Sequence, residues 1–150
     1  MTYRSWMRIA LGYLALVSLE IGVWAQFAPR SFFDDFPGLG RAWVSVDGLY
    51  NEHLVRDVGG LNLGLAAVLI VALITLSRPT IIAASLASLL YGVPHLVYHI
   101  ANRDGLSDSD AAISLGGLAL FAVLPLTLIV VSRRRPIDIT PLDAVSERRR

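Results

Sequence analysis

Two histidines, His95 and His99, stand four residues apart inside a long apolar stretch of the sequence. On a helix, this spacing puts both imidazoles on one face, as a helical metal site requires. The third histidine, His53, precedes Asp57 by the same four residues. Imidazole with carboxylate suits zinc, iron or copper(II). We therefore expect a divalent transition metal, where one binds, to take its ligands from these four side chains.

Other polar side chains also fall within or beside the apolar stretches. Ionisable groups in a membrane are costly and usually face the protein interior or water. A reversal of the chain at Arg78 and Pro79 brings residues equally far from that turn to one depth, which puts Asn62 level with His95. We expect Glu20, Asn62 and Tyr98 to line the same pocket and to contact a small ligand.

The pocket has other interpretations. Histidine titrates near neutrality, so a proton relay fits the same residues. A purely structural network of hydrogen bonds between helices also fits. A haem with two histidine ligands is disfavoured because His53 lies at the rim, well above His95. The sequence has no His-Glu-x-x-His motif and no nucleophile elbow, so it favours a non-enzymatic role. A membrane-embedded, metal-dependent lipid hydrolase is kept as an alternative.

The composition indicates a membrane protein. Of 150 residues, 55% are hydrophobic and only 17% are charged, against about 25% charged in an ordinary soluble domain. The absence of cysteine excludes disulfides and cysteine-ligated zinc. A formal net charge of +1 argues against a nucleic-acid partner.

Four apolar runs are long enough to cross the roughly 30 Å of hydrocarbon in a bilayer as helices. They cover residues 7–28, 58–77, 80–101 and 111–132. Pro79 leaves room for only a tight turn between the second and third runs, so these two helices form an antiparallel hairpin. Pro94 and Pro125 fall inside helices, which should kink and continue. The sequence predicts an all-α, four-helix transmembrane bundle.

The distribution of arginine predicts the orientation. Nine arginines fall on the side of the two termini, and four fall with eight acidic residues on the other side. Cytoplasmic loops carry the excess of basic residues. Both termini should therefore be cytoplasmic, in the inner or plasma membrane of the cell.

Residues 29–57 form the one long segment between spans, and they mix aromatic with acidic side chains. Because aromatic residues prefer the headgroup level, we expect an extracytoplasmic cap across the mouth of the bundle, with a short helix. The transmembrane domain is predicted to end at residue 132. Residues 133–150 form an Arg-rich cytoplasmic tail, in which Thr140 to Asp143 is typical of a helix start; a disordered tail fits equally.

Small residues recur at helical spacing near the histidines. Gly60 and Gly64 continue the stripe of His53 and Asp57, and Ser88 and Gly92 continue that of His95. Small residues let membrane helices approach closely. We expect the two stripes to face each other, and Gly60 and Gly64 to support self-association or contact with other membrane subunits.

The segment from Arg56 to Gly64, Arg-Asp-Val-Gly-Gly-Leu-Asn-Leu-Gly, together with the four-span layout, resembles the small DoxX-like membrane proteins of actinobacteria. The lysine-free, arginine-rich composition is compatible with such a source. Many of these proteins are uncharacterised, and some are membrane partners of quinone-linked or sulfur oxidoreductases. The resemblance implies an accessory role in a membrane redox complex. A purely structural subunit without a ligand is the alternative.

Overall fold

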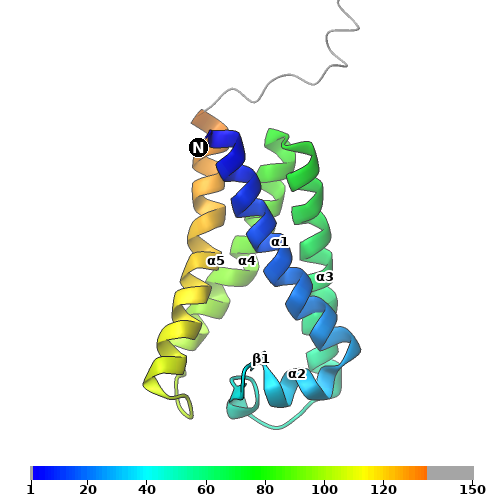
Figure 1. The fold of residues 1–150 in the computed structure, drawn as a ribbon, viewed down its shortest axis with the longest axis vertical. Helices are drawn as coiled ribbons and strands as arrows, with labels where there is room; N and C mark the ends of the chain where they lie inside the picture. The colour runs from blue at the N-terminus through cyan, green and yellow to red at the C-terminus, as the bar shows by residue number, and fades with distance from the viewer. Residues whose placement is uncertain (1, 135–150) are drawn as a thin grey trace, which may run out of the picture.

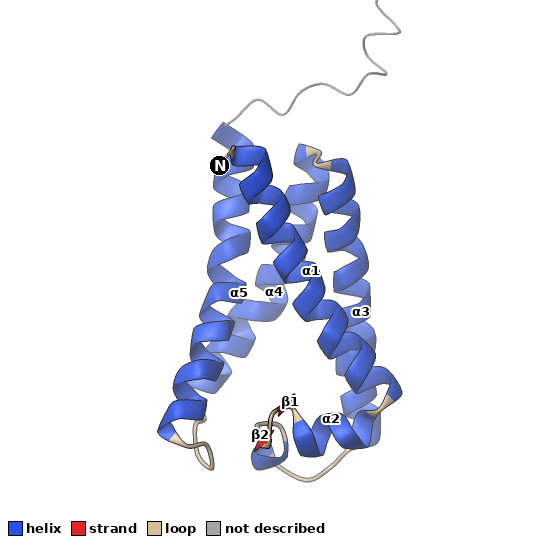
Figure 2. Ribbon diagram, in the orientation of Figure 1, coloured by secondary structure: helices blue, strands red, loops and turns tan. Residues whose placement is uncertain are grey.

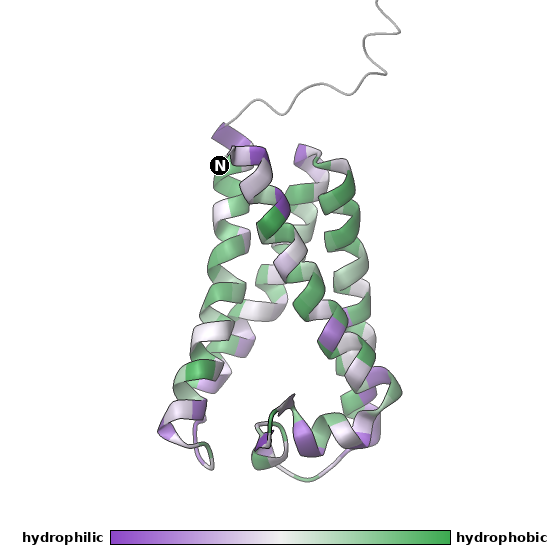
Figure 3. Ribbon diagram, in the orientation of Figure 1, coloured by the Kyte–Doolittle hydropathy of each residue, from purple (hydrophilic) through white to green (hydrophobic). Residues whose placement is uncertain are grey.

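The computed structural model of the protein describes residues 2–134. Four long helices dominate it (Figure 2): α1 (Tyr3–Phe27), α3 (Glu52–Thr75), α4 (Arg78–Ala101) and α5 (Asp108–Arg134). Each has 24 or more residues and is apolar enough to cross a membrane, since about 20 helical residues suffice. Figure 3 shows these helices as mainly hydrophobic, with hydrophilic residues concentrated near their ends. The predicted fold of four long apolar helices is confirmed.

The chain itself specifies where these helices begin. The side chains of Thr2, Asn51 and Ser77 accept hydrogen bonds from backbone N–H groups in the first turns of α1, α3 and α4. Ser107 Oγ accepts the N–H of Asp110 in the same way at α5, at 3.1 Å. These polar caps satisfy amides that have no partner within the helix.

The structure extends the predicted spans at their ends. The second helix begins at Glu52 and not at residue 58, so the charged residues Glu52, His53, Arg56 and Asp57 are helical. The tight turn of the predicted hairpin is confirmed, because only Leu76 and Ser77 separate α3 from α4. Helices α4 and α5 continue through Pro94 and Pro125, as expected. The predicted tail helix at 140–143 lies outside the described residues.

The connector, residues 28–51, joins α1 to α3 and contains the expected short helix, α2 (Pro29–Asp35). A two-stranded hairpin follows, with β1 (Pro37–Gly38) paired antiparallel to β2 (Arg41–Ala42). Leu39 and Gly40 form its turn with φ angles of 59° and 74°, the left-handed values that a two-residue hairpin turn requires. A 3-10 helix, η1 (Ser45–Asp47), completes the connector.

The long helices pack as two antiparallel pairs. Helix α1 packs mainly on α3 and α4 mainly on α5, while α3 and α4 contact each other less. Figure 1 shows the pairs close together at the end that carries Thr2 and Arg134, here called the terminal end. They diverge toward the opposite, connector end, where the hairpin and α2 lie between them. The connector therefore spans the two halves of the molecule.

The main core lies toward the terminal end, where all four long helices contribute fully buried side chains. The largest are Met7, Leu11, Leu14, Leu69, Ile81 and Leu128. A smaller cluster of Ala25, Phe32 and Val55 attaches the connector to α1 and α3. This division gives the connector end fewer buried apolar contacts than the terminal end.

The predicted pairing of the two small-residue stripes is wrong. Gly60 and Gly64 are exposed, and an added Cβ at Gly64 would meet nothing within 4 Å. The close approach of α1 and α3 depends instead on Gly59, where an added Cβ would lie 2.5 Å from the backbone nitrogen of Gln26. On α4, Gly92 faces Phe121 of α5 and not α3. Consecutive residues on a helix point about 100° apart. When Gly59 faces α1, the stripe that contains Gly60 and Gly64 therefore faces outward.

Candidate functional site

Three planar side chains follow one face of α4 toward the connector end, at Tyr91, His95 and His99. We call them the α4 ring row. The rings of Tyr91 and His95 stack nearly parallel, with centroids 5.4 Å apart and planes 16° apart. The ring of His99 meets His95 edge-on at 4.7 Å. Their spacing of four residues explains this contact, since such residues lie one above the other on a helix.

The amide of Asn62 on α3 meets this row. It is 2% exposed, and its Nδ2 donates to Val58 O at 2.9 Å and to the hydroxyl of Tyr91 at 3.4 Å. Its Oδ1 is buried without a hydrogen-bond partner. Buried polar atoms normally have a partner because desolvation without one is costly. The structure thus brings together Asn62 and His95 on neighbouring helices, with Tyr91 between them.

The other two predicted metal ligands lie apart from the ring row. His53 Nε2 is 3.4 Å from Asp57 Oδ2, and their side chains are 88% and 55% exposed. Within residues 2–134, no three His, Asp or Glu side chains are grouped closely enough to hold a metal ion. The four predicted ligands therefore form two separate pairs, His53 with Asp57 and His95 with His99.

Glu20 and Tyr98 are less closely associated with the row. Tyr98 is 48% exposed, and its ring meets that of His99 edge-on at 5.4 Å. Glu20 is exposed on α1. Among the described residues, no hydrogen bond or ion pair joins Glu20 to the other predicted site residues. Glu20 is thus the predicted site residue with the least structural support.

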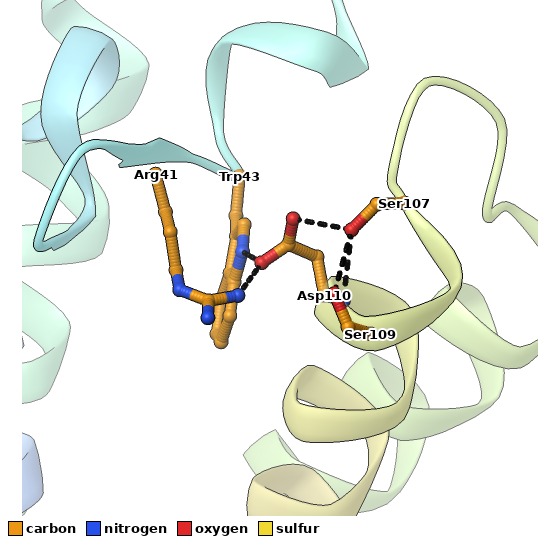
Figure 4. A network of polar contacts seen from close by, with 5 residues as sticks. All are labelled: Arg41, Trp43, Ser107, Ser109 and Asp110. Carbon is orange, nitrogen blue, oxygen red and sulfur yellow. Dashed lines mark hydrogen bonds and ion pairs between the residues drawn. The ribbon is translucent and has the colours of Figure 1, made fainter.

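A second polar cluster links the connector to α5 (Figure 4). Asp110 in the first turn of α5 accepts hydrogen bonds from Trp43 Nε1 at 2.9 Å, from Ser107 Oγ at 2.6 Å and from the guanidinium of Arg41. Arg41 and Trp43 extend from the hairpin side, whereas Ser107 and Asp110 belong to the start of α5. We call these four residues the Asp110 cluster. It ties the connector to the second helix pair.

Contacts of a different kind hold the connector on the first helix pair. Trp24 of α1 packs edge-on against Phe32 and donates from Nε1 to Ser31 Oγ at 3.2 Å. Within the connector itself, the guanidinium of Arg30 lies 5.0 Å from the centre of the Tyr50 ring. Partial burial raises the pKa of Tyr50, and the hydrogen bond to Asp34 raises the pKa of Arg30. Both groups therefore keep their usual protonation at neutral pH.

A shallow open hollow of about 540 Å³ lies where α1 and α3 meet at the connector end. It is lined by Gln26, Arg56, Asp57, Gly60 and Leu61. Arg56 pairs with Glu52 one turn earlier, at 2.8 Å, as the spacing predicts, and it also donates to the backbone oxygen of Gln26.

Several of these residues were not predicted from the sequence. In the Asp110 cluster, Arg41 and Trp43 contact a residue that is 67 or more positions away in the sequence. No local spacing of residues predicts such a contact. Tyr91 did carry a signal, because Tyr91, His95 and His99 repeat at intervals of four.

No protein-family model, curated protein or solved structure matches the chain. The DoxX-like resemblance therefore stays a hypothesis.

Proposed function

We propose that the chain is a multi-pass plasma-membrane protein that binds a small ligand at its connector end. In this proposal both termini are cytoplasmic and the connector is the extracytoplasmic cap. In the sequence, nine arginines fall on the side of the two termini and four on the other side, and this excess supports the orientation. The protein would act as an accessory component of a membrane complex, with a redox role implied by the DoxX-like resemblance.

The observation that carries the ligand proposal is the unpaired Oδ1 of Asn62 beside the α4 ring row. A buried acceptor without a partner favours binding of a group that donates a hydrogen bond. A row of rings such as Tyr91, His95 and His99 packs favourably against a further aromatic ring, and imidazole adds a donor or acceptor. The ligand best matched to this surface is planar and carries at least one O–H or N–H group.

The connector controls access in this proposal. It is held to the first helix pair by aromatic packing and to the second by the Asp110 cluster. Because the Asp110 cluster is polar and partly exposed, it is the weaker of the two attachments. Release of Asp110 from Arg41 and Trp43 would free the connector from α5 and give a ligand access to the α4 ring row.

A metal ion is less well supported as the ligand. Zinc, iron or copper(II) commonly takes three or more protein ligands, whereas His95 and His99 supply two and the second pair, His53 with Asp57, is separate. A metal at His95 and His99 would need a further ligand from a partner chain or from a rearranged connector.

Mass spectrometry of the purified protein under native conditions tests the ligand proposal. We expect a bound small molecule, distinct from phospholipid, that is released on denaturation. A wild-type protein that carries nothing except lipid and detergent, and that binds no member of a panel of planar phenols and quinols, contradicts the proposal.

A further inference from the structure

The hollow between α1 and α3 lies outside the ligand site proposed above, and its lining is unusual for a lipid-facing surface. Asp57 and Arg56 contribute opposite charges, and their side chains are 55% and 42% exposed. Below them along α3 the surface turns apolar, with Leu61 at 68% and Val68 at 41% exposure. The charged side chains thus lie nearer the connector end and the apolar ones lie deeper along α3. This is the order of headgroups and acyl chains in one leaflet of a bilayer.

Two glycines continue the surface of α3 below the hollow, Gly60 at its lower edge and Gly64 one turn further. An added Cβ at Gly64 would meet no atom within 4 Å, and one at Gly60 would meet only the Gln26 side chain, at 3.7 Å. Both glycines are exposed, and neither is used to bring α1 against α3, which depends on Gly59. Gly60 and Gly64 put no side chains on the face of α3 that runs from Asp57 toward Val68, about 16 Å at 1.5 Å per residue, and we call this face the glycine track.

The charges select among lipid headgroups. Arg56 uses three of its five N–H groups on Glu52 and on the backbone of Gln26, which leaves two for a phosphate. Asp57 has carboxylate lone pairs for an ammonium group. With Glu52 beside them, the site has two acids and one arginine, and His53, which pairs with Asp57, is charged only when protonated. An added negative charge is therefore unfavourable while His53 is neutral. A headgroup with no net charge, but with a phosphate and a primary ammonium, matches this pattern.

We propose that the hollow and its glycine track bind one phospholipid with a primary ammonium headgroup, of the phosphatidylethanolamine class. Its phosphate contacts Arg56, its ammonium donates hydrogen bonds to Asp57, and one acyl chain lies along Gly60, Leu61 and Gly64. Phosphatidylcholine is a poorer match because its quaternary ammonium has no N–H to donate. Phosphatidylglycerol is poorer because it has no cation for Asp57.

Native mass spectrometry of delipidated, full-length protein with the three lipids tests this proposal. We expect phosphatidylethanolamine to bind at least several-fold more tightly than phosphatidylcholine or phosphatidylglycerol. Equal binding of the three lipids overturns the proposal, and this comparison needs no variant. It is also independent of the ligand at the α4 ring row, since His95 does not line the hollow.

Two variants locate the lipid. Asp57→Asn removes the charge that pairs with the ammonium and should weaken phosphatidylethanolamine binding about tenfold, to the level of phosphatidylcholine. Its control is Asp104→Asn, at an exposed acid in the loop before α5. Gly64→Leu fills the track and should weaken all three lipids. Its control is Gly117→Leu, at an exposed glycine on α5 with equally open surroundings.

A second copy of the chain is the competing occupant. If Gly64→Leu converts a dimer to a monomer while phosphatidylethanolamine binding stays unchanged, the face is a protein interface and the lipid proposal is wrong. The proposal is also wrong if Asp57→Asn and Asp104→Asn have the same effect on lipid binding.

Discussion

Trp43 donates its indole N–H to Asp110 at 2.9 Å, and this bond joins the connector to the first turn of α5. The residues are 67 positions apart in sequence, so the contact exists only because the connector crosses from one helix pair to the other. It makes Asp110 the attachment point of the proposed cap.

The first prediction concerns this attachment. Asp110→Ala removes the acceptor for Trp43 and Arg41, and leaves the indole N–H without its partner. We expect a lower Tm in detergent and a red shift of tryptophan fluorescence as Trp43 becomes more hydrated. Asp108→Ala, at an exposed acid in the same turn, should change neither. If the two variants behave alike, the cluster does not hold the connector.

A second prediction contrasts two adjacent glycines. Gly59→Ala should destabilise the protein by about 1–3 kcal/mol, because the added methyl group overlaps the backbone of Gln26. Gly60→Ala should be neutral or stabilise by up to about 1 kcal/mol, since alanine is the better helix former and has room here. Unfolding of the two variants in parallel measures the difference. The same loss for both would mean that Gly59 is not the contact point of α1 and α3.

These glycines also show how much the sequence could predict. Hydropathy specified the four spans, and Ser77 with Pro79 specified the tight turn, because both signals are local. The choice between Gly59 and Gly60 is not local: it depends on which face of α3 meets α1. The Gly-x-x-x-Gly spacing favoured Gly60 and Gly64, but those two residues lie on the exposed face.

The candidate site likewise contains contacts that local spacing predicts and groupings that depend on how the helices pack. The i, i+4 spacing predicted that His53 and Asp57 share one helix face, as do His95 and His99, and in the structure the two members of each pair are in contact. The expectation that both pairs share one group of metal ligands has no support within the described residues. Whether the two pairs share one site depends on which helices pack together. Because α3 packs mainly on α1 and α4 mainly on α5, the two pairs lie apart.

A third prediction separates stability from binding at Asn62. Asn62→Leu replaces a buried amide, whose Oδ1 has no partner, by an apolar side chain of similar size. We expect stability to change by less than about 1 kcal/mol, or to rise, because an unpaired buried acceptor is removed. Binding of the ligand at the α4 ring row should be lost. A variant that keeps full binding would remove Asn62 from the proposed site.

Metal content provides a fourth prediction. Elemental analysis of the purified protein should find less than one zinc, iron or copper ion per chain, with no further decrease in His95→Ala or His99→Ala. One metal ion per chain that disappears in both variants would instead support the metal form of the site, with a ligand from outside the described group.

The most direct test compares the ligand content of His95→Ala with that of His53→Ala by native mass spectrometry. The α4 ring row includes His95, whereas His53 is 88% exposed and lies in the separate pair with Asp57. We predict that the wild type and His53→Ala carry the same bound small molecule and that His95→Ala loses at least nine-tenths of it. Retention of the molecule by His95→Ala, or its loss from His53→Ala alone, would contradict a ligand site at the α4 ring row.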